Sequence, residues 1–159
     1  MKIQKGIGLL ELLLAFSIIA VLLISATRYY QAAQDSRKIQ LALDTVQAVY
    51  YAGEQYVENV GQLQLNNNIE SFKQHGYLPD NFSASDNPWG GDITAVSAAE
   101  TSSTKMKMTL TNITLSACKK LTAKVASSKF IDPRAVVSDC GTSSPATIEI
   151  IFSDYMAAS

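Results

Sequence analysis

Histidine and cysteine are scarce in this chain, which has one His and two Cys among its 159 residues. The two cysteines, Cys118 and Cys140, lie far apart in the sequence, so the chain cannot supply the four ligands of an ordinary Cys and His zinc site. Catalytic sets of Ser, His and Asp, or of Cys and His, would all have to share His75. We therefore expect a protein that is not an enzyme and that needs no metal or other cofactor.

Charged residues are also few, at 17% of the chain, whereas 47% of the residues are hydrophobic. This composition is too apolar for a disordered tail, and the length suits one domain rather than two independent cores. The net charge of −1 argues against a generally basic nucleic-acid binder. The lysines at 119, 120 and 124 have no clustered aromatics for base stacking, so nucleic acid is not an expected partner.

A run of twenty apolar residues, from Ile7 to Ala26, is interrupted by a single charge, Glu11. A helix of this length covers roughly 30 Å, which is about the thickness of the hydrocarbon core of a membrane. Tyr29 and Tyr30 follow at the position of an interfacial aromatic belt. The run therefore predicts a membrane-spanning helix.

The residues before this run form a short polar stretch that ends at Gly6, and Glu11 follows five residues later. This arrangement resembles the class III leader of type IV prepilins and of the related pseudopilins. The resemblance implies that a membrane-embedded prepilin peptidase cleaves between Gly6 and Ile7 on the cytoplasmic face, and that the new amine of Ile7 is methylated. The alternative is a plain signal anchor whose Glu11 reaches towards the headgroups.

Glu11 itself demands a partner. A carboxylate inside a membrane helix costs about 2.5 to 3.5 kcal/mol on insertion scales, so it is usually functional. No Lys or Arg lies one helical turn away, and the nearest cation after cleavage would be the α-amino group of Ile7. The resemblance implies that this amine, on a neighbouring subunit, neutralises Glu11 during filament assembly.

The apolar run continues into a helical pattern, because no Pro or Gly occurs between Gly8 and Gly53. Apolar residues recur at helical spacings in Ile39, Leu43, Val46, Tyr50 and Val57. The pattern predicts one helix from about residue 7 to about residue 60, roughly 80 Å long. Such a helix is too long to be buried in the rest of the chain, so its first half must lie in lipid or against other copies.

The remainder alternates short elements with turns. We expect a short helix over 69–74, strands over 93–96, 105–110, 136–137 and 148–152, and a helix of about twelve residues from Leu115 to Val125. The turn over 87–91, Asn-Pro-Trp-Gly-Gly, resembles an element that pseudopilins and some pilins place before the first strand. We interpret Trp89 as a packing residue rather than a ligand-binding one.

Together these elements predict an α+β fold, and strands separated by a helix resemble the type IVb pilin arrangement. The resemblance implies the type IV pilin fold: a long N-terminal helix packed on an antiparallel β-sheet, with an additional helix between strands. The predicted organisation is a leader peptide over 1–6, a transmembrane and assembly helix over 7–26, an amphipathic continuation over 27–60, and an α+β head over 61–159.

A disulfide is the economical interpretation of Cys118 and Cys140, with two buried free thiols as the alternative. Such a bond persists outside the cytosol, so it would place the head on the periplasmic or outer face. The resemblance agrees, because type IV pilins commonly close a C-terminal loop with one disulfide.

Charge is polarised along the chain. Residues 39–100 contain eight acidic residues and one basic residue, whereas residues 101–159 contain seven basic and four acidic ones. Our hypothesis is that these halves meet between neighbouring subunits, and the alternative is that both are ordinary solvated faces.

Asp86, Asn87 and Asp92 lie near a Gly-rich turn but form no regular calcium loop. His75 precedes Gly76 at a predicted helix end, where we expect it to cap carbonyl groups.

These observations lead to the expectation of a structural subunit of a type IV pilus. Its partners would be other pilin subunits, the prepilin peptidase and the inner-membrane pilus assembly machinery. The precursor would reside in a bacterial inner membrane with its head in the periplasm, and the assembled form would be extracellular. The alternatives are a minor pilin, a type II secretion pseudopilin and, from a different class, a monomeric membrane-anchored binding protein.

Overall fold

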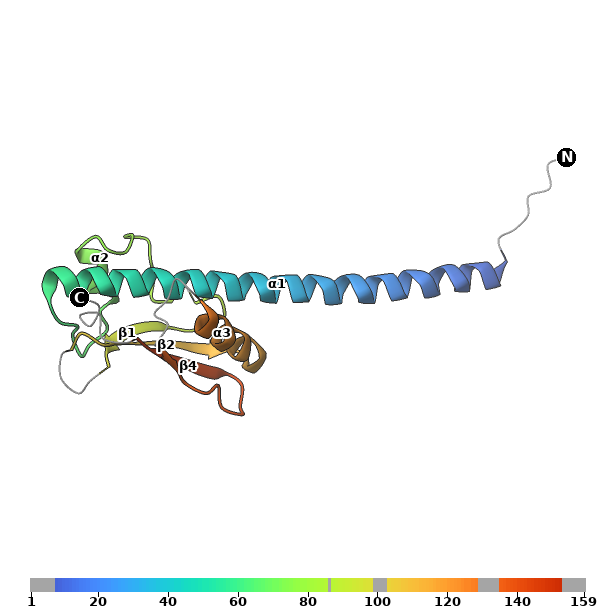
Figure 1. Ribbon diagram of the computed structural model, residues 1–159. Helices are drawn as coiled ribbons and strands as arrows, with labels where there is room; N and C mark the ends of the chain where they lie inside the picture. The colour runs from blue at the N-terminus through green and yellow to red at the C-terminus, as the bar shows by residue number, and fades with distance from the viewer. Residues whose placement is uncertain (1–7, 86, 99–102, 129–134, 153–159) are drawn as a thin grey trace. The chain divides into compact units, whose positions relative to one another are not determined.

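The computed structural model describes residues 8–85, 87–98, 103–128 and 135–152. The chain divides into two compact units, residues 1–37 and 38–159. Helix α1, Leu9–Val60, belongs to both and confirms the predicted long helix (Figure 1). It ends before Gly61, whose φ of 113° is unfavourable for a residue with a side chain and marks the helix stop.

In the first unit, α1 presents its apolar residues to the outside. Every residue from 8 to 33 is exposed. By length and composition the helix is able to cross a membrane, and none of its most apolar stretch is buried within the chain. The segment predicted to span a membrane is thus helical, and its apolar side chains are exposed.

In the second unit, α1 carries a buried stripe that packs on the sheet. The stripe consists of Ile39, Ala42, Val46, Val49, Ala52, Gly53, Tyr56 and Val57. Their spacing of three and four residues keeps them on one side of a helix. The predicted stripe members Leu43 and Tyr50 lie at its edge and are half-buried against the same core.

The sheet has four antiparallel strands in the order β1-β2-β4-β3. The strands are β1 (Ile93–Ser97), β2 (Met106–Ile113), β3 (Val136–Val137) and β4 (Ala146–Ile151). Alternate residues are buried, with Ile93 opposite Leu110 and Leu110 opposite Ile148. This confirms an α+β fold in which one sheet face packs against the core.

Strand β2 extends beyond the predicted end at residue 110. The register between β2 and β4 shifts between Leu110 and Ile113, and Asn112 adopts a left-handed φ of 59°. Such an irregularity interrupts the two-residue period of apolar side chains. The alternation in the sequence therefore ends before the strand does.

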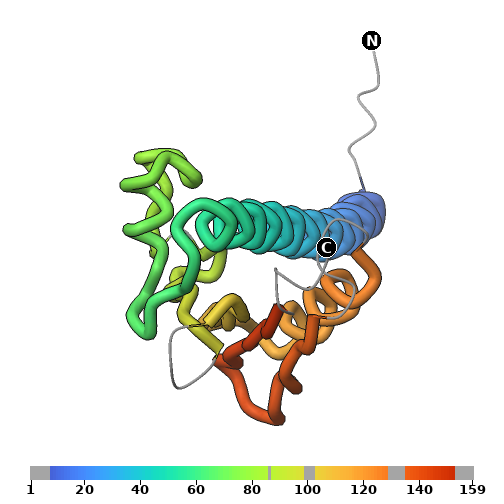
Figure 2. The backbone as a smooth tube through the Cα atoms, turned by 60° about the vertical axis from the view of Figure 1, so that its left-hand side comes forward, coloured from blue at the N-terminus to red at the C-terminus, as the bar shows by residue number. Residues whose placement is uncertain are grey.

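Helix α3, Leu115–Ser127, connects β2 to the strand that follows and packs against β3 and β4. It buries Ala117, Cys118, Leu121 and Val125, so the predicted helix between strands is present. In Figures 1 and 2, α3 lies near the beginning of the second unit's part of α1. The short helix α2, Ile69–Gln74, lies at the other end, beside the end of α1.

The outer edge of β1 is occupied by polar groups of the loop before α2. The backbone N–H of Ala95 donates to the Asn67 side chain at 2.9 Å, and its carbonyl accepts from the backbone and side chain of Asn68 at 2.7 and 3.0 Å. The N–H of Ser97 donates to the Gln64 carbonyl at 2.9 Å. The loop before α2, which contains three consecutive asparagines at 66–68, therefore fixes α2 to the sheet.

The turn before β1 is held by side-chain hydrogen bonds to the backbone. The buried Asn87 side chain donates to the Thr111 carbonyl at 2.7 Å and accepts from the Trp89 N–H at 3.1 Å. The Asn112 side chain donates to the Trp89 carbonyl at 2.9 Å. Trp89 is half-buried against the core, as its interpretation as a packing residue requires.

Gly91 is buried where this turn meets β2, and a Cβ at this position would collide with the Thr111 backbone. We expect Gly91→Ala to lower the free energy of unfolding by about 3 kcal/mol, because backbone rather than a flexible side chain must shift. Urea unfolding of the full chain in detergent micelles, followed by the fluorescence of the single tryptophan, measures this.

The matched control is Gly90→Ala. A Cβ there meets nothing within 4 Å, and only its φ of 76° opposes the substitution. That variant should lose about 1 kcal/mol. An equal loss in the two variants would contradict the predicted collision at Gly91.

Candidate functional site

Glu11 lies in the first turn of α1, on a fully exposed part of the helix. Its Oε2 accepts from the backbone N–H of Gly8 at 3.4 Å, a long hydrogen bond. The first N–H groups of a helix have no partner within the helix, and they favour a nearby negative charge. The start of α1 therefore favours a carboxylate, but the Gly8 N–H occupies only one of the hydrogen-bond acceptor positions of Glu11.

The hydroxyl groups of the apolar run are satisfied within the helix. Ser17 donates to the Leu14 carbonyl at 2.7 Å, and Ser25 donates to the Val21 carbonyl at 2.9 Å. The Thr27 hydroxyl donates to the Ile24 carbonyl at 2.9 Å. Such internal bonds are what an apolar surrounding requires of a hydroxyl. Glu11 is the single charged side chain from residue 8 to residue 27, and it stands apart from these satisfied groups.

The surface around Glu11 is made of leucines, with Leu9 and Leu10 each 78% exposed. Further along the first unit, a shallow groove of about 260 Å³ is lined by Ser17, Ile18, Val21 and Leu22. A carboxylate on an apolar, grooved helix can pair with a cation and pack against another helix. The predicted cleavage site at Gly6 and Ile7, and methylation at Ile7, lie outside the described residues.

The predicted disulfide is present between Cys118 and Cys140, which are 22 residues apart and have Cα atoms separated by 5.9 Å. Cys118 is buried in α3, whereas Cys140 follows β3 and is half-buried. The Thr122 hydroxyl donates to the Cys140 Sγ at 3.6 Å. The bond ties α3 to the loop that leads into β4.

His75 caps the end of α2, as its position in the sequence predicts. Its backbone N–H donates to the Ser71 carbonyl at 3.1 Å, and its Nδ1 donates to the same carbonyl at 2.8 Å. The ring stacks on Tyr77 and meets Tyr56 edge-on, with centroid distances of 6.1 and 5.3 Å. The sequence contains no local signal for this aromatic cluster, because Tyr56 comes from α1.

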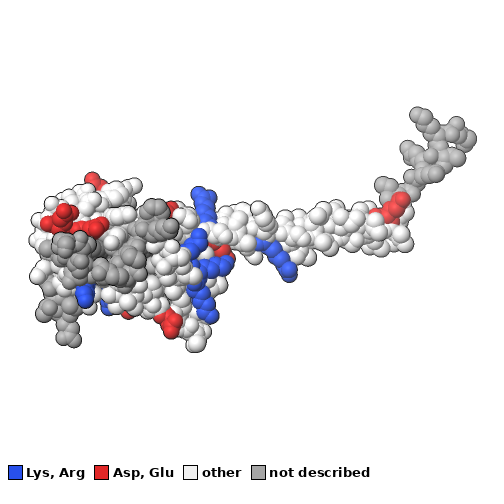
Figure 3. All heavy atoms as spheres, viewed as in Figure 1, with Lys and Arg blue, Asp and Glu red and all other residues white. Residues whose placement is uncertain are grey.

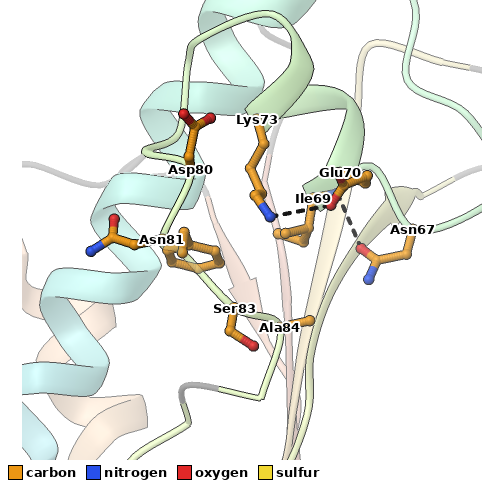
Figure 4. Close-up of a pocket in the computed structure, with 9 residues that line it drawn as sticks. Asn67, Ile69, Glu70, Lys73, Asp80, Asn81, Ser83 and Ala84 are labelled. Atoms are coloured by element: carbon orange, nitrogen blue, oxygen red, sulfur yellow. Dashed lines mark hydrogen bonds and ion pairs between the residues drawn. The ribbon is translucent and has the colours of Figure 1, made fainter.

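A polar pocket of about 440 Å³ lies between α2 and the loop after it (Figure 4). Lys73 and Glu70, both from α2, pair across one side at 3.3 Å, while Asp80 and Asn81 lie on the loop side. The Asn67 side chain accepts from the Ile69 N–H at 3.3 Å and from Ala95. Most of the polar groups on the α2 side thus bond to one another.

The calcium candidates do not converge. The Asn87 side chain is bonded to Thr111 and Trp89, Asp92 is exposed, and Asp86 lies outside the described residues. In the part of the chain that the structure describes, no three His, Cys, Asp or Glu residues are grouped as metal ligands.

Comparisons of this chain with protein-family models, with characterised proteins and with solved structures gave no match.

We expect the Cys118→Ser, Cys140→Ser double variant to lose about 3 kcal/mol of unfolding free energy, because the bond closes a loop of about twenty residues in the unfolded chain. Urea unfolding of the full chain in detergent micelles measures the loss. Wild-type protein reduced with dithiothreitol provides the control and should unfold at a similar urea concentration. An unchanged midpoint in both samples would contradict a stabilising role for the bond.

Proposed function

We propose that this chain is a structural subunit of a type IV pilus, made as a prepilin, cleaved after Gly6 and assembled through its N-terminal helix into an extracellular filament. The observation that carries the proposal is Glu11, the single charge in the apolar first part of α1. Among the described residues, the hydrogen bond of its carboxylate is a long one from the Gly8 N–H. The resemblance of residues 1–11 to a class III leader implies cleavage after Gly6, and it implies that the partner of Glu11 is the new α-amino group of Ile7 on a neighbouring subunit.

The pairing step follows from the desolvation of charge. Cleavage between Gly6 and Ile7 creates an α-amino group, which is cationic. When two such helices pack side by side in an apolar surrounding, an amine on one and Glu11 on the other neutralise each other. A buried pair of this kind is strongly register-dependent, because removal of one partner leaves an uncompensated charge that costs about 3 to 5 kcal/mol.

The rest of the helix surface supports association along its length. A second shallow groove on the first unit, of about 440 Å³, is lined by Leu23, Ala26, Thr27, Tyr30 and Gln31. Grooves on a helix accept the side-chain ridges of another helix. The small residue at 26 and the satisfied hydroxyl at 27 allow close approach without an unpaired polar group.

The second unit forms the head of the proposed subunit. Its disulfide fits an oxidising compartment, which supports a periplasmic position for the precursor and an extracellular position in the filament. The proposed partners are other copies of the chain, the prepilin peptidase and the inner-membrane assembly machinery. The membrane holds the subunit before assembly.

Intact-mass spectrometry of the protein from cell membranes and from sheared surface material tests this proposal. We expect the sheared fraction to contain a chain that starts at N-methylated Ile7 and lacks two thiol hydrogens. An unprocessed chain that starts at Met1 and occurs only in membranes would overturn the proposal and favour an anchored monomer.

We expect Glu11→Gln to be processed normally but to give at least about tenfold less sheared filament, because the amine of the neighbouring subunit loses its counter-charge. Glu11→Ala should behave alike. Ser25→Ala is the matched control, since Ser25 lines neither helix groove and its hydroxyl bonds within its own helix among the described contacts. Normal filament numbers in Glu11→Gln would refute the pairing role.

A further inference from the structure

Helix α3 carries an exposed basic surface, which we call the lysine face: Lys119, Lys120 and Lys124. α3 contains no acidic residue, and the exposed residues between and after these lysines, such as Ala123 and Ser127, are small. Figure 3 shows Lys and Arg gathered over this region of the second unit. The lysine face is therefore accessible and free of internal neutralisation on its own helix.

The last turns of α1 carry the opposite charge on their outer side. Glu54 and Glu58 are exposed and lie four residues apart. Tyr51, three residues before Glu54, lies on the same side of the helix and is 41% exposed. From Ile39 to Val60 the helix has no Lys or Arg. We call Tyr51, Glu54 and Glu58 the carboxylate face.

The two faces lie at opposite ends of the second unit. α3 lies near the beginning of this unit's part of α1, whereas Glu54 and Glu58 belong to its end, beside α2 (Figures 1 and 2). Among the described residues, the ion pairs are Lys73 with Glu70 and Lys107 with Glu149. Neither the lysine face nor the carboxylate face therefore has an ion pair within the part of the chain that the structure describes.

We propose that the lysine face of one copy docks on the carboxylate face of a second copy, with α3 lying along the end of α1. This inference rests on the proposed function, in which copies of the chain meet. Lys120 and Lys124, like Glu54 and Glu58, are four residues apart, so the charges on each helix lie about 6 Å apart along its axis. Antiparallel helices bring these two pairs into one-to-one register, and the small residues of α3 leave room for Tyr51.

The two faces lie at opposite ends of the unit, so one copy can contact two different neighbours through them. In the proposed filament this contact is heterologous and repeats from copy to copy, which leaves one unused face of each sign at the ends. Because exposed ion pairs contribute only about 0.2 to 1 kcal/mol each and are screened by salt, the contact selects register and is weakened by high ionic strength.

A charge-swap experiment in the full chain, expressed in its own cells, tests the docking. Lys120→Glu with Lys124→Glu, and separately Glu54→Lys with Glu58→Lys, should each reduce sheared filament at least about tenfold, because like charges then face each other. The four substitutions together should restore the yield to within about threefold of wild type. Asp92→Lys with Lys105→Glu, two exposed charges outside both faces, is the matched control and should leave the yield unchanged.

A second measurement does not depend on filaments. A photo-crosslinking benzoyl-phenylalanine placed at Gln55, an exposed residue beside Glu54, should yield crosslinked dimers in membranes, and mass mapping should place the crosslink in residues 119–127. Wild-type yield in either charge-reversed variant, or crosslinks that map elsewhere on the second copy, would overturn the docking. If wild-type cells shed no filament, the proposed function fails, and the crosslink map alone decides whether the two faces meet.

Discussion

The bare apolar surface of α1 is the constraint on which the rest of the molecule depends. A helix that exposes leucine, isoleucine and valine over residues 9–24 leaves a large apolar surface uncovered, which is typical of helices that enter lipid or pack on an apolar partner. Within that surface the serine and threonine hydroxyls bond to their own helix, so their polarity costs little in an apolar surrounding. Glu11 is different, because an ionised group cannot be satisfied by a single long bond to Gly8. The proposed pairing with a neighbouring amine addresses this unmet requirement.

The second unit forms a separate hydrophobic core, which is built around the second half of α1. The stripe from Ile39 to Val57 and the inward residues of four short strands bury one another. The disulfide fastens α3, which packs against β3 and β4, to the loop before β4. The helix can thereby present its lysines outward while its buried side remains fixed.

Sequence reasoning predicted the features that depend on local periodicity. The three-and-four spacing after residue 39 predicts α1, and the alternation over 105–110 predicts most of β2. The same reasoning missed the end of β2, because Asn112 breaks the alternation while the strand continues. It also missed the contact of His75 with Tyr56, since the two residues approach only after the chain has folded.

The candidate site divides in the same way. Glu11 is recognisable from sequence because a charge in an apolar run is a local anomaly, and the two cysteines are recognisable because no other pairing exists. The distribution of charge along the chain suggests that acidic and basic parts meet. Only the fold shows that Lys120 and Glu58 lie at opposite ends of one unit, because that placement depends on how α3 returns towards the start of α1.

The loop before α2 has a consequence for how copies of the chain approach one another. An uncovered edge strand invites a strand from another molecule to extend the sheet, which is the first step towards uncontrolled aggregation. In β1, the outward N–H groups of Ile93, Ala95 and Ser97 are already bonded to Ala84, Asn67 and Gln64, and the Ala95 carbonyl is bonded to Asn68. A strand from another molecule cannot bond to these groups. At this edge, the proposed contact between copies therefore depends on side chains, which can discriminate between partners, rather than on the backbone, which cannot.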